Sequence, residues 1–367
     1  MFRITEKIQI GDYVFNSILD TEINTSYDSI TDTAMIKFKN VLYREKNQPT
    51  YISSSTLTSL IKRGDVVKIW NGYDTTEENL TLKFSGFVDR IQPDENITVY
   101  AQDYGYVLKN IQVETQRIKD ATLMELVETV IGHTLIFVDY IDKDANVGTW
   151  QIDNNNYVSA IQIFDELKSK FGLVAYFRDV STLKIGKLDD ITGNTYNFIF
   201  EHNIINNNLT YRADHELNLS IKGVSILDNN ERITRYAYLT KNTDEDGDHF
   251  VITVSQSSIA GEQRTLTFYN RTAAQLAQDL RDNFYKYIYI GYSGNFETFL
   301  EPSVTHGDYV NLYSLKSPEK NGRYRVKSVK ERVSDSGGRQ TIELDYKVKD
   351  LQDIRTGVNN IKTQPNT

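Results

Sequence analysis

The feature that most constrains the fold is an alternation of apolar and polar residues with a period of two. It runs through residues 80–88 (LTLKFSGFV) and residues 339–348 (RQTIELDYKV), among others. Such alternation is typical of half-buried β-strands. Short turn sequences, such as Pro93–Asn96 and Ser336–Gly338, separate the alternating runs. Because turns this short cannot join parallel strands, the sequence predicts antiparallel hairpins.

Three segments depart from this pattern and show helical spacing of apolar residues, at residues 119–133, 157–173 and 270–291. Each begins with residues that can cap a helix: Asp120 in the first, Ser159 with Gln162 in the second, and Thr272 with Gln275 in the third. Gly132, Gly172 and Gly291 follow their ends. We interpret the apolar stripes as core-packing faces.

Composition excludes several classes of protein. The chain has 367 residues, no cysteine and a formal net charge of −9. Disulfides, thiolate nucleophiles and cysteine-based metal sites are therefore excluded. The acidic balance, without a Lys/Arg-rich stretch, argues against stable nucleic-acid binding. No apolar run is long enough for a membrane span, and no secretory signal begins the chain, so we expect folding in a cytoplasm.

The organisation along the chain predicts a β-rich α+β fold. Residues 1–105 form a first β-rich block, residues 106–205 a small α/β middle domain, and residues 206–350 a second β-rich block with a helix at about 272–290. Residues 351–367 have no periodicity and are expected to be a flexible tail.

The two β-rich blocks share a Gly-Asp motif, Gly64-Asp65 in the first and Gly307-Asp308 in the second. Each motif leads into an alternating strand. The interval from Gly64 to Val99 equals the interval from Gly307 to Ile342, and matching patterns occur at both ends. In between, Gly86, Val88 and Ile91 of the first block correspond to Gly322, Val326 and Val329 of the second. The repeat favours an internal duplication, although short β motifs also recur by chance.

The chemistry of a Gly-Asp pair suits a turn. Glycine tolerates positive φ, and the aspartate side chain can accept a hydrogen bond from a backbone N–H within the turn. We therefore interpret Gly64, Asp65, Gly307 and Asp308 as structural turn residues. Catalytic carboxylates would need partners in a pocket, for which the sequence offers no indication. An adhesion role for Arg63-Gly64-Asp65 is disfavoured because the tripeptide runs directly into a strand.

Other candidate sites do not meet the requirements of their chemistry. The acidic loop at 244–248 resembles a calcium loop, but Thr253 stands where a bidentate acid is required, so a solvated hairpin tip is favoured. The five histidines are scattered, and Ser59 with Lys62 lacks the companion motifs of a serine–lysine nucleophile. We expect no catalytic residue, no cofactor and no metal.

The order of these motifs resembles a known family. The segments that carry the resemblance are GDVVKIW, FSGFVDRI, ITVYAQDYGYVL, IFDELKSKFGLVAYF, TAAQLAQDL, YIGYSGNFETFLEPSVTHGDYVNLY and GRYRVKSVKERVSDSGGRQTIELDY. In this order they are similar to the baseplate hub proteins of contractile phage tails, the late control D family. These are related to the hub portion of type VI secretion spike proteins. The resemblance covers roughly residues 5 to 350.

The resemblance implies a structural protein of a virion baseplate or of a phage tail-like particle, assembled in the bacterial cytoplasm. It implies two tail-tube-like β-barrels per chain and a homotrimer whose pseudo-six-fold ring joins a hexameric tail tube to a trimeric spike. Expected partners are the tail tube or a tube-initiator protein, a separate central spike protein and other baseplate proteins. We also expect acidic residues on the wall of a central channel.

Two alternatives belong to other classes. A β-rich, cell-wall-degrading tail enzyme would need two acids converging in a cleft. A carbohydrate-binding tail module would need an exposed groove lined by aromatic residues. The aromatic run at 283–292 could stack on bases or sugars, but packing of a helix end against a barrel or a neighbouring subunit is favoured.

Overall fold

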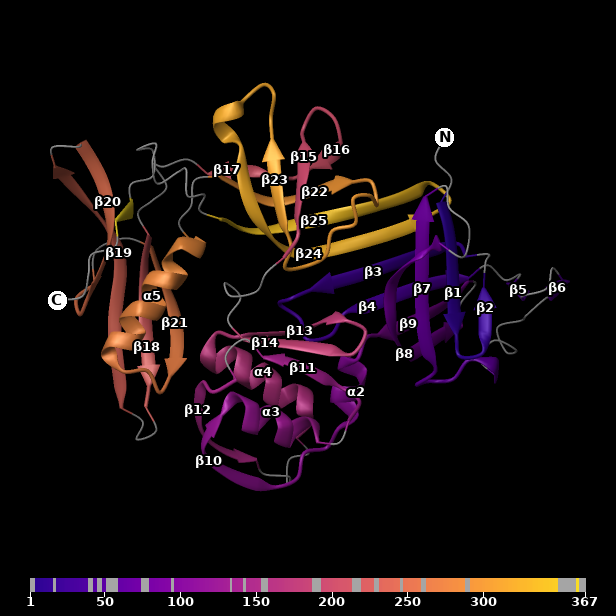
Figure 1. The fold of residues 1–367 in the computed structure, drawn as a ribbon, viewed down its shortest axis with the longest axis horizontal. Coiled ribbons are helices and arrows are strands. Elements are labelled where there is room, and N and C mark those ends of the chain that lie inside the picture. The colour runs from indigo at the N-terminus through magenta and orange to yellow at the C-terminus, as the bar shows by residue number, and fades with distance from the viewer. Residues whose placement is uncertain are drawn as a thin grey trace.

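The computed structural model describes the following residues: 4–15, 18–38, 42–44, 48–50, 59–73, 79–93, 96–132, 134–140, 143–152, 158–186, 193–212, 219–227, 231–244, 247–258, 262–287, 291–348 and 361–362. Figure 1 shows four parts, which we call the first β unit, the middle unit, the second β unit and the lateral unit. The β-rich, largely antiparallel fold predicted from the alternation is confirmed.

The first β unit contains the strands of the N-terminal block. They are β1 (Ile4–Ile10), β2 (Tyr13–Phe15), β3 (Asp20–Ser26), β4 (Thr33–Phe38), β5 (Leu42–Arg44), β6 (Gln48–Thr50), β7 (Val66–Tyr73), β8 (Thr81–Pro93) and β9 (Ile97–Gln102). Their order is β3-β4-β9-β8-β7-β1-β2-β5-β6. The apolar residues of the alternation, such as Ile36, Val67 and Val99, are buried in one core.

The middle unit follows directly. It contains α2 (Gly105–Asn110), β10 (Gln116–Thr122), α3 (Leu123–Ile131), β11 (Phe137–Tyr140), β12 (Asn146–Ile152), α4 (Ala160–Phe171), β13 (Val174–Asp179) and β14 (Thr182–Gly186). The apolar stripes of α3 and α4 lie in its core, as the sequence predicts.

Of the three helix N-caps predicted from the sequence, one is wrong and two are confirmed. Helix α3 is capped by Thr122, whose side chain accepts a hydrogen bond from the Glu125 N–H, so the prediction of Asp120 as N-cap is wrong. Asp120 lies instead at an irregular position of β10. The capping boxes of Ser159 and Thr272 are confirmed.

The second β unit combines strands from two separate stretches of chain. They are β15 (Thr195–Ile199), β16 (Ile204–Asn207), β17 (Thr210–Arg212), β22 (Gly291–Thr298), β23 (Tyr309–Tyr313), β24 (Gly322–Ser334) and β25 (Gly337–Lys347), with a short 3-10 helix, η5 (Pro318–Lys320). Strand β15 pairs with β23, and β16 pairs with β22. Strands of this unit therefore begin before residue 206, the boundary that the sequence predicts.

The lateral unit lies at one side of the molecule (Figure 1). It contains β18 (Leu219–Ile226), β19 (Arg232–Asp244), β20 (Gly247–Ser255), β21 (Glu262–Tyr269), α5 (Ala273–Tyr287) and β26 (Ile361–Lys362). Its five strands form a sheet of their own. Leu276, Leu280 and Phe284 of α5 are buried against that sheet in a separate core.

The two β units are joined edge to edge by β3 and β24 (Figure 1). The antiparallel pairing runs from Ser26 opposite Ser328 to Asp20 opposite Ser334. One sheet is therefore continuous through both units. The description of the units as two tail-tube-like barrels stays a prediction.

Candidate functional site

The first Gly-Asp motif forms a tight turn before β7. Gly64 has a φ of +90°, in the region that favours glycine. The Lys62 backbone N–H donates to Asp65 Oδ2 over 2.7 Å. The turn is held against β8 because the Gly64 N–H donates to the Val88 carbonyl over 2.8 Å and the Val88 N–H donates to the Asp65 carbonyl over 2.9 Å. The aspartate caps the turn, and the main chain fixes it to the next strand.

The second motif has the same geometry before β23. Gly307 has a φ of +81°. The Thr305 N–H donates to Asp308 Oδ2 over 3.1 Å. The Gly307 N–H donates to the Val326 carbonyl over 2.8 Å, and the Val326 N–H donates to the Asp308 carbonyl over 2.9 Å. Each hydrogen bond of the first turn therefore has a counterpart at the second.

The correspondence continues along the following hairpin. The ladder between β8 and β9 is irregular just after Val88, and the ladder between β24 and β25 is irregular just after Val326. The pairs of opposed residues are Val88 with Ala101, Ile91 with Val99, Val326 with Leu344, and Val329 with Ile342. The strand order β3-β4-β9-β8-β7 of the first unit recurs as β16-β22-β25-β24-β23 in the second.

The two turns differ in what surrounds them. Asp308 is only 1% exposed, and its Oδ1 accepts hydrogen bonds from Arg178 Nη2 over 3.2 Å and from the Asn194 N–H over 2.9 Å. Arg178 belongs to β13 of the middle unit. Asp65 is partly exposed. The second turn therefore also holds the middle unit against the second β unit.

The joint between β3 and β24 carries ion pairs on the face opposite the cores. The Arg332 guanidinium contacts both Asp20 carboxylate oxygens, over 2.9 and 2.8 Å. Lys330 Nζ lies 2.7 Å from Glu22 Oε2. Since these groups are partly exposed, each pair contributes about 1 kcal/mol or less to stability. The pairs fix the register more than they stabilise the joint.

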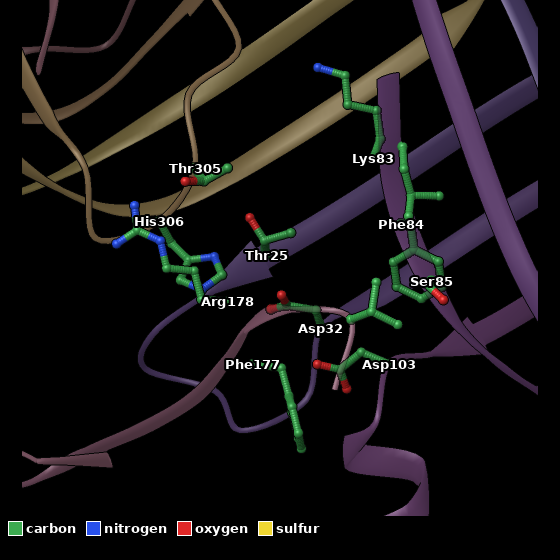
Figure 2. Close-up of a pocket in the computed structure, with 12 residues that line it drawn as sticks. Thr25, Asp32, Lys83, Phe84, Ser85, Asp103, Phe177, Arg178, Thr305 and His306 are labelled. Carbon is green, nitrogen blue, oxygen red and sulfur yellow. The ribbon is translucent and has the colours of Figure 1, made fainter. Parts of the chain in front are cut away.

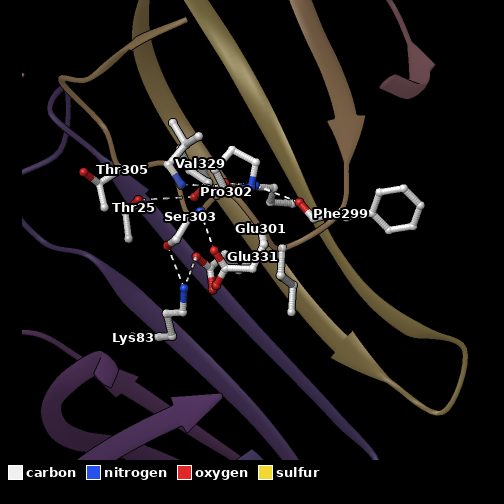
Figure 3. Close-up of polar contacts among 12 residues, drawn as sticks. Thr25, Lys83, Phe299, Glu301, Pro302, Ser303, Thr305, Val329 and Glu331 are labelled. Carbon is white, nitrogen blue, oxygen red and sulfur yellow. Dashed lines mark hydrogen bonds and ion pairs between the residues drawn. The ribbon is translucent and has the colours of Figure 1, made fainter. Parts of the chain in front are cut away.

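The core side of the joint holds a buried polar cluster (Figure 3). Lys83 Nζ donates to Ser303 Oγ over 2.6 Å and lies 3.9 Å from Glu331 Oε1. Burial raises the pKa of Glu331, and the charge of Lys83 opposes this shift. Burial also raises the pKa of nearby Glu6 to about 8, and the carboxylates of Asp20 and Glu331 add to the effect. A proton held by Glu6 at neutral pH limits its repulsion with the Asp20 and Glu331 carboxylates.

A pocket of about 240 Å³ lies where the two β units and the middle unit meet (Figure 2). Asp32 and Asp103 line it from the first β unit, Arg178 from the middle unit and His306 from the second. Burial raises the pKa of Asp103 to about 7 and raises that of Asp32, to which the Asp103 charge contributes. Burial, with the charge of Arg178, lowers the pKa of His306 to about 3.

The pocket's carboxyl groups are tied to their own loops. Asp32 Oδ1 accepts a hydrogen bond from the Ser26 N–H over 2.9 Å, and Asp103 Oδ1 accepts one from the Gly105 N–H over 2.8 Å. The His306 ring packs edge-on against Tyr176, with 4.7 Å between ring centroids. The ring contact joins the middle unit to the second β unit, whereas the two carboxyl contacts stay within their own loops. Sequence reasoning missed this cluster because its members come from distant segments, although His306 directly precedes the second Gly-Asp motif.

Among the described residues, the structure gives no support for a site at the histidines, at the acidic loop or at Ser59 with Lys62. Within the described residues, no group of three or more His, Asp or Glu side chains could hold a metal. In the acidic loop at 244–248, Asp246 lies outside the described residues, as do His133 and His215 elsewhere. Ser59 and Lys62 are exposed beside the first turn.

No family model and no curated protein matches the sequence. Solved structures match over nearly the whole chain. A prophage MuSo2 43 kDa tail protein from Shewanella oneidensis has a TM-score of 0.59 at 13% identity, covering 93% of this chain and 97% of its own. A tail protein from Neisseria meningitidis MC58 has a TM-score of 0.61 at 10% identity, with coverages of 94% and 96%.

A third match is an Escherichia coli component of the type VI secretion system, which is described as similar in structure to the T4 bacteriophage tail proteins gp27 and gp5. It has a TM-score of 0.52 at 8% identity, and the match covers 93% of this chain and 77% of that protein. The chain therefore has the fold of phage tail and type VI secretion proteins. At the level of fold, the resemblance inferred from the sequence is confirmed.

Proposed function

We propose that the chain is a structural subunit of a baseplate hub in a contractile phage tail or phage tail-like particle. The observation that carries the proposal is the occurrence, twice in one chain, of the same turn, the same ladder irregularity and the same five-strand order. The two copies are joined through β3 and β24. One chain therefore supplies two quasi-equivalent positions.

Two positions per chain allow one ring of three chains to contact both a six-fold and a three-fold neighbour. Three chains present six similar units, which match a hexameric tube ring on one side, and the same three chains match a trimeric spike on the other. The proposed homotrimer encloses a central channel. The four turn residues Gly64, Asp65, Gly307 and Asp308 have a structural part in this proposal, because they orient the first strand of each repeated hairpin.

The proposed partners are a tail tube or tube-initiator protein, a separate spike protein and other baseplate proteins, in a particle assembled in the bacterial cytoplasm. Matches to two PdpA-VgrG complex structures, one of them described as from Francisella, have TM-scores of 0.52 and 0.50 and support association with spike-type proteins. Among the described helices, none has the length and apolarity needed to cross a membrane. An acidic channel wall also stays a prediction, and the ion pairs opposite the cores give that face of the sheet charges of both signs.

The proposed role is not enzymatic. The matched structures are described as tail or secretion-system components. The pocket at the junction of the units holds acids bound by their own loops, an arrangement that favours a joint over a hydrolytic cleft.

Native mass spectrometry of the purified chain tests the proposal. We expect a species of three times the chain mass, in proportions that rise with protein concentration. A chain that stays monomeric at every concentration would contradict a self-assembling ring. Release of fragments from purified peptidoglycan, or retention on a glycan column, would instead support the enzymatic or carbohydrate-binding alternatives.

A further inference from the structure

Two buried aspartates lie side by side in the pocket at the junction of the units (Figure 2). Asp32 directly precedes β4, and Asp103 directly follows β9. Thr33 pairs with Gln102, and the ladder continues with the Asp103 N–H, which donates to the Asp32 carbonyl over 3.0 Å. Opposed residues of an antiparallel pair have Cβ atoms about 5 Å apart. The pairing therefore brings two carboxyl groups together where bulk water has little access.

The loops of the chain use only part of the hydrogen-bonding capacity of this pair. Asp32 Oδ1 accepts from the Ser26 N–H, and Asp103 Oδ1 accepts from the Gly105 N–H. Asp103 Oδ2 is buried and has no hydrogen-bond partner among the described residues. Leaving a buried acceptor without a donor is costly. The pocket therefore offers an acceptor to a donor that the described part of the chain does not supply.

The two cations that line the pocket are matched by other acids. Lys83 Nζ lies 3.9 Å from Glu331 Oε1, and Arg178 Nη2 lies 3.2 Å from Asp308 Oδ1. His306 is neutral at neutral pH, because burial and the charge of Arg178 lower its pKa to about 3. Each cation of the lining thus has an acid of its own, and the two aspartates add two acidic groups beyond these pairs.

The pocket has the size and the rim expected for one long side chain. Its volume of about 240 Å³ is several times the ~30 Å³ that a water molecule occupies. It is smaller than the roughly 300–1,000 Å³ of a site for a drug-sized ligand. Leu82 and Val180 line it and are exposed. Next to Val180, the Ser181 carbonyl accepts from the N–H of Phe137, whose side chain is 69% exposed. An exposed apolar rim therefore adjoins the acidic pair.

We propose that this pocket receives a basic side chain from a partner protein, for which arginine is best suited. In the proposed contact the charged head lies between Asp32 and Asp103. The aliphatic stem lies along the rim formed by Leu82 and Val180. Arginine combines an apolar stem with a planar head that can donate to two carboxylates at once. A metal ion suits the pair less well, since no third His, Asp or Glu of the described residues completes a group with it. The inference goes beyond the proposed hub function, because the contact requires no ring.

Binding of a cation should release protons from the pair. Burial raises the pKa of Asp103 to about 7, and the charge of Lys109 offsets only part of this shift. Burial and the charge of Asp103 raise the pKa of Asp32. A group with a pKa near 7 is about one-tenth ionised at pH 6 and about nine-tenths ionised at pH 8. Since a cation binds the ionised form better, its affinity should rise with pH over this interval. The other charged or titratable groups of the lining are Lys83, Arg178 and His306.

Isothermal titration calorimetry of the full chain tests the pocket, with acetyl-arginine amide as the probe. Acetyl-citrulline amide is the control ligand, because it has nearly the same shape without the charge. Asp103→Asn removes the carboxylate charge and keeps an oxygen that can accept from the Gly105 N–H. Asp12→Asn, the matched control variant, removes an acid from the exposed turn between β1 and β2, outside the pocket. Circular dichroism checks that each variant is folded, and magnesium chloride is titrated in parallel.

We expect acetyl-arginine amide to bind at least about tenfold more tightly than acetyl-citrulline amide at pH 8, and about tenfold more tightly at pH 8 than at pH 6. Asp103→Asn should remove this preference, and Asp12→Asn should keep it. Where Asp103→Asn does not fold, Leu82→Ala at the exposed rim should weaken the probe at least about threefold. No binding, equal binding of the two ligands, or full binding by a folded Asp103→Asn variant would overturn the proposal. Magnesium that binds and displaces the probe would assign the pair to a metal and overturn it too.

A second probe tests whether the basic group comes from a protein. Acetyl-Leu-Arg-Leu amide carries apolar neighbours that can contact the exposed side chain of Phe137. We expect it to bind at least about threefold more tightly than acetyl-arginine amide, and Phe137→Ala should remove the gain. Equal or weaker binding of the longer probe would assign the pocket to a free small cation and overturn the partner protein. Native mass measurements of the ring are independent of each of these results.

Discussion

Substitution of Asp308 should show most clearly that the two Gly-Asp turns contribute differently to stability. In Asp308→Ala, Arg178 Nη2, the Asn194 N–H, the Thr305 N–H and the Thr305 hydroxyl all lose their common acceptor. In Asp65→Ala, the matched change at the first turn, the Lys62 N–H loses its acceptor in a partly exposed turn. Asp308→Ala thus removes a buried carboxylate that accepts several hydrogen bonds. Asp65→Ala removes a single capping hydrogen bond.

The magnitudes follow from burial. Removing one partner of a buried ion pair costs about 3–5 kcal/mol, because the remaining groups stay desolvated. Removing a capping hydrogen bond at a partly exposed position costs about 1 kcal/mol. We therefore expect Asp308→Ala to lower the free energy of unfolding by about 2–4 kcal/mol more than Asp65→Ala does. Asp308→Asn keeps Oδ1 but turns an amide toward Thr305, so its loss should fall in between.

Urea denaturation followed by tyrosine and tryptophan fluorescence measures these differences, with linear extrapolation of the free energy of unfolding. The comparison is valid where the dependence on urea is unchanged between variants. Equal losses for Asp65→Ala and Asp308→Ala, within about 0.5 kcal/mol, would refute the role assigned to Asp308 in holding the middle unit. So would a full recovery of stability in Asp308→Asn.

Two further predictions concern stability. Burial raises the pKa of Glu6 to about 8 from an ordinary value of 4.5, so the folded chain holds a proton that the unfolded chain has released. The free energy of unfolding should then fall as pH rises from about 5 to 8, by at most about 1.4 kcal/mol per pH unit. Glu6→Gln should flatten this dependence on pH. Urea titrations that give Glu6→Gln the same slope as the unchanged chain would refute the role of Glu6. Gly307→Ala should be more destabilising than Gly64→Ala, because the added Cβ would lie 3.1 Å from the Tyr176 hydroxyl at the second turn and 3.6 Å from the Tyr106 hydroxyl at the first. Thermal midpoints that rank the two variants in the opposite order would contradict this.

Much of the local structure could be predicted from the sequence because it depends on neighbouring residues. Alternation placed the strands, and Val88 and Val326 could be matched by their order between the Gly-Asp motif and the end of each repeat, although their spacings from the motif differ. The cap of α3 is Thr122 rather than Asp120, and Thr122 with Glu125 three residues later is the stronger sequence signal for a capping box.

The features that bring distant segments together could not be read in the same way. The pairing of β3 with β24 joins strands some three hundred residues apart, and periodicity carries no information about which edges meet. The lateral unit has the same alternation as its neighbours, so its separate core was not apparent. The Asp32, Asp103 and His306 cluster likewise depends on how three units pack.

The central claim is that one chain occupies two equivalent positions in a ring. Electron-microscope class averages of the isolated assembly, viewed along the ring axis, test it most directly. We expect six similar densities around a central opening, with alternate densities distinguished by the middle and lateral units, so that the strict symmetry is three-fold. A ring with any other number of densities, or an assembly without a central opening, would contradict it.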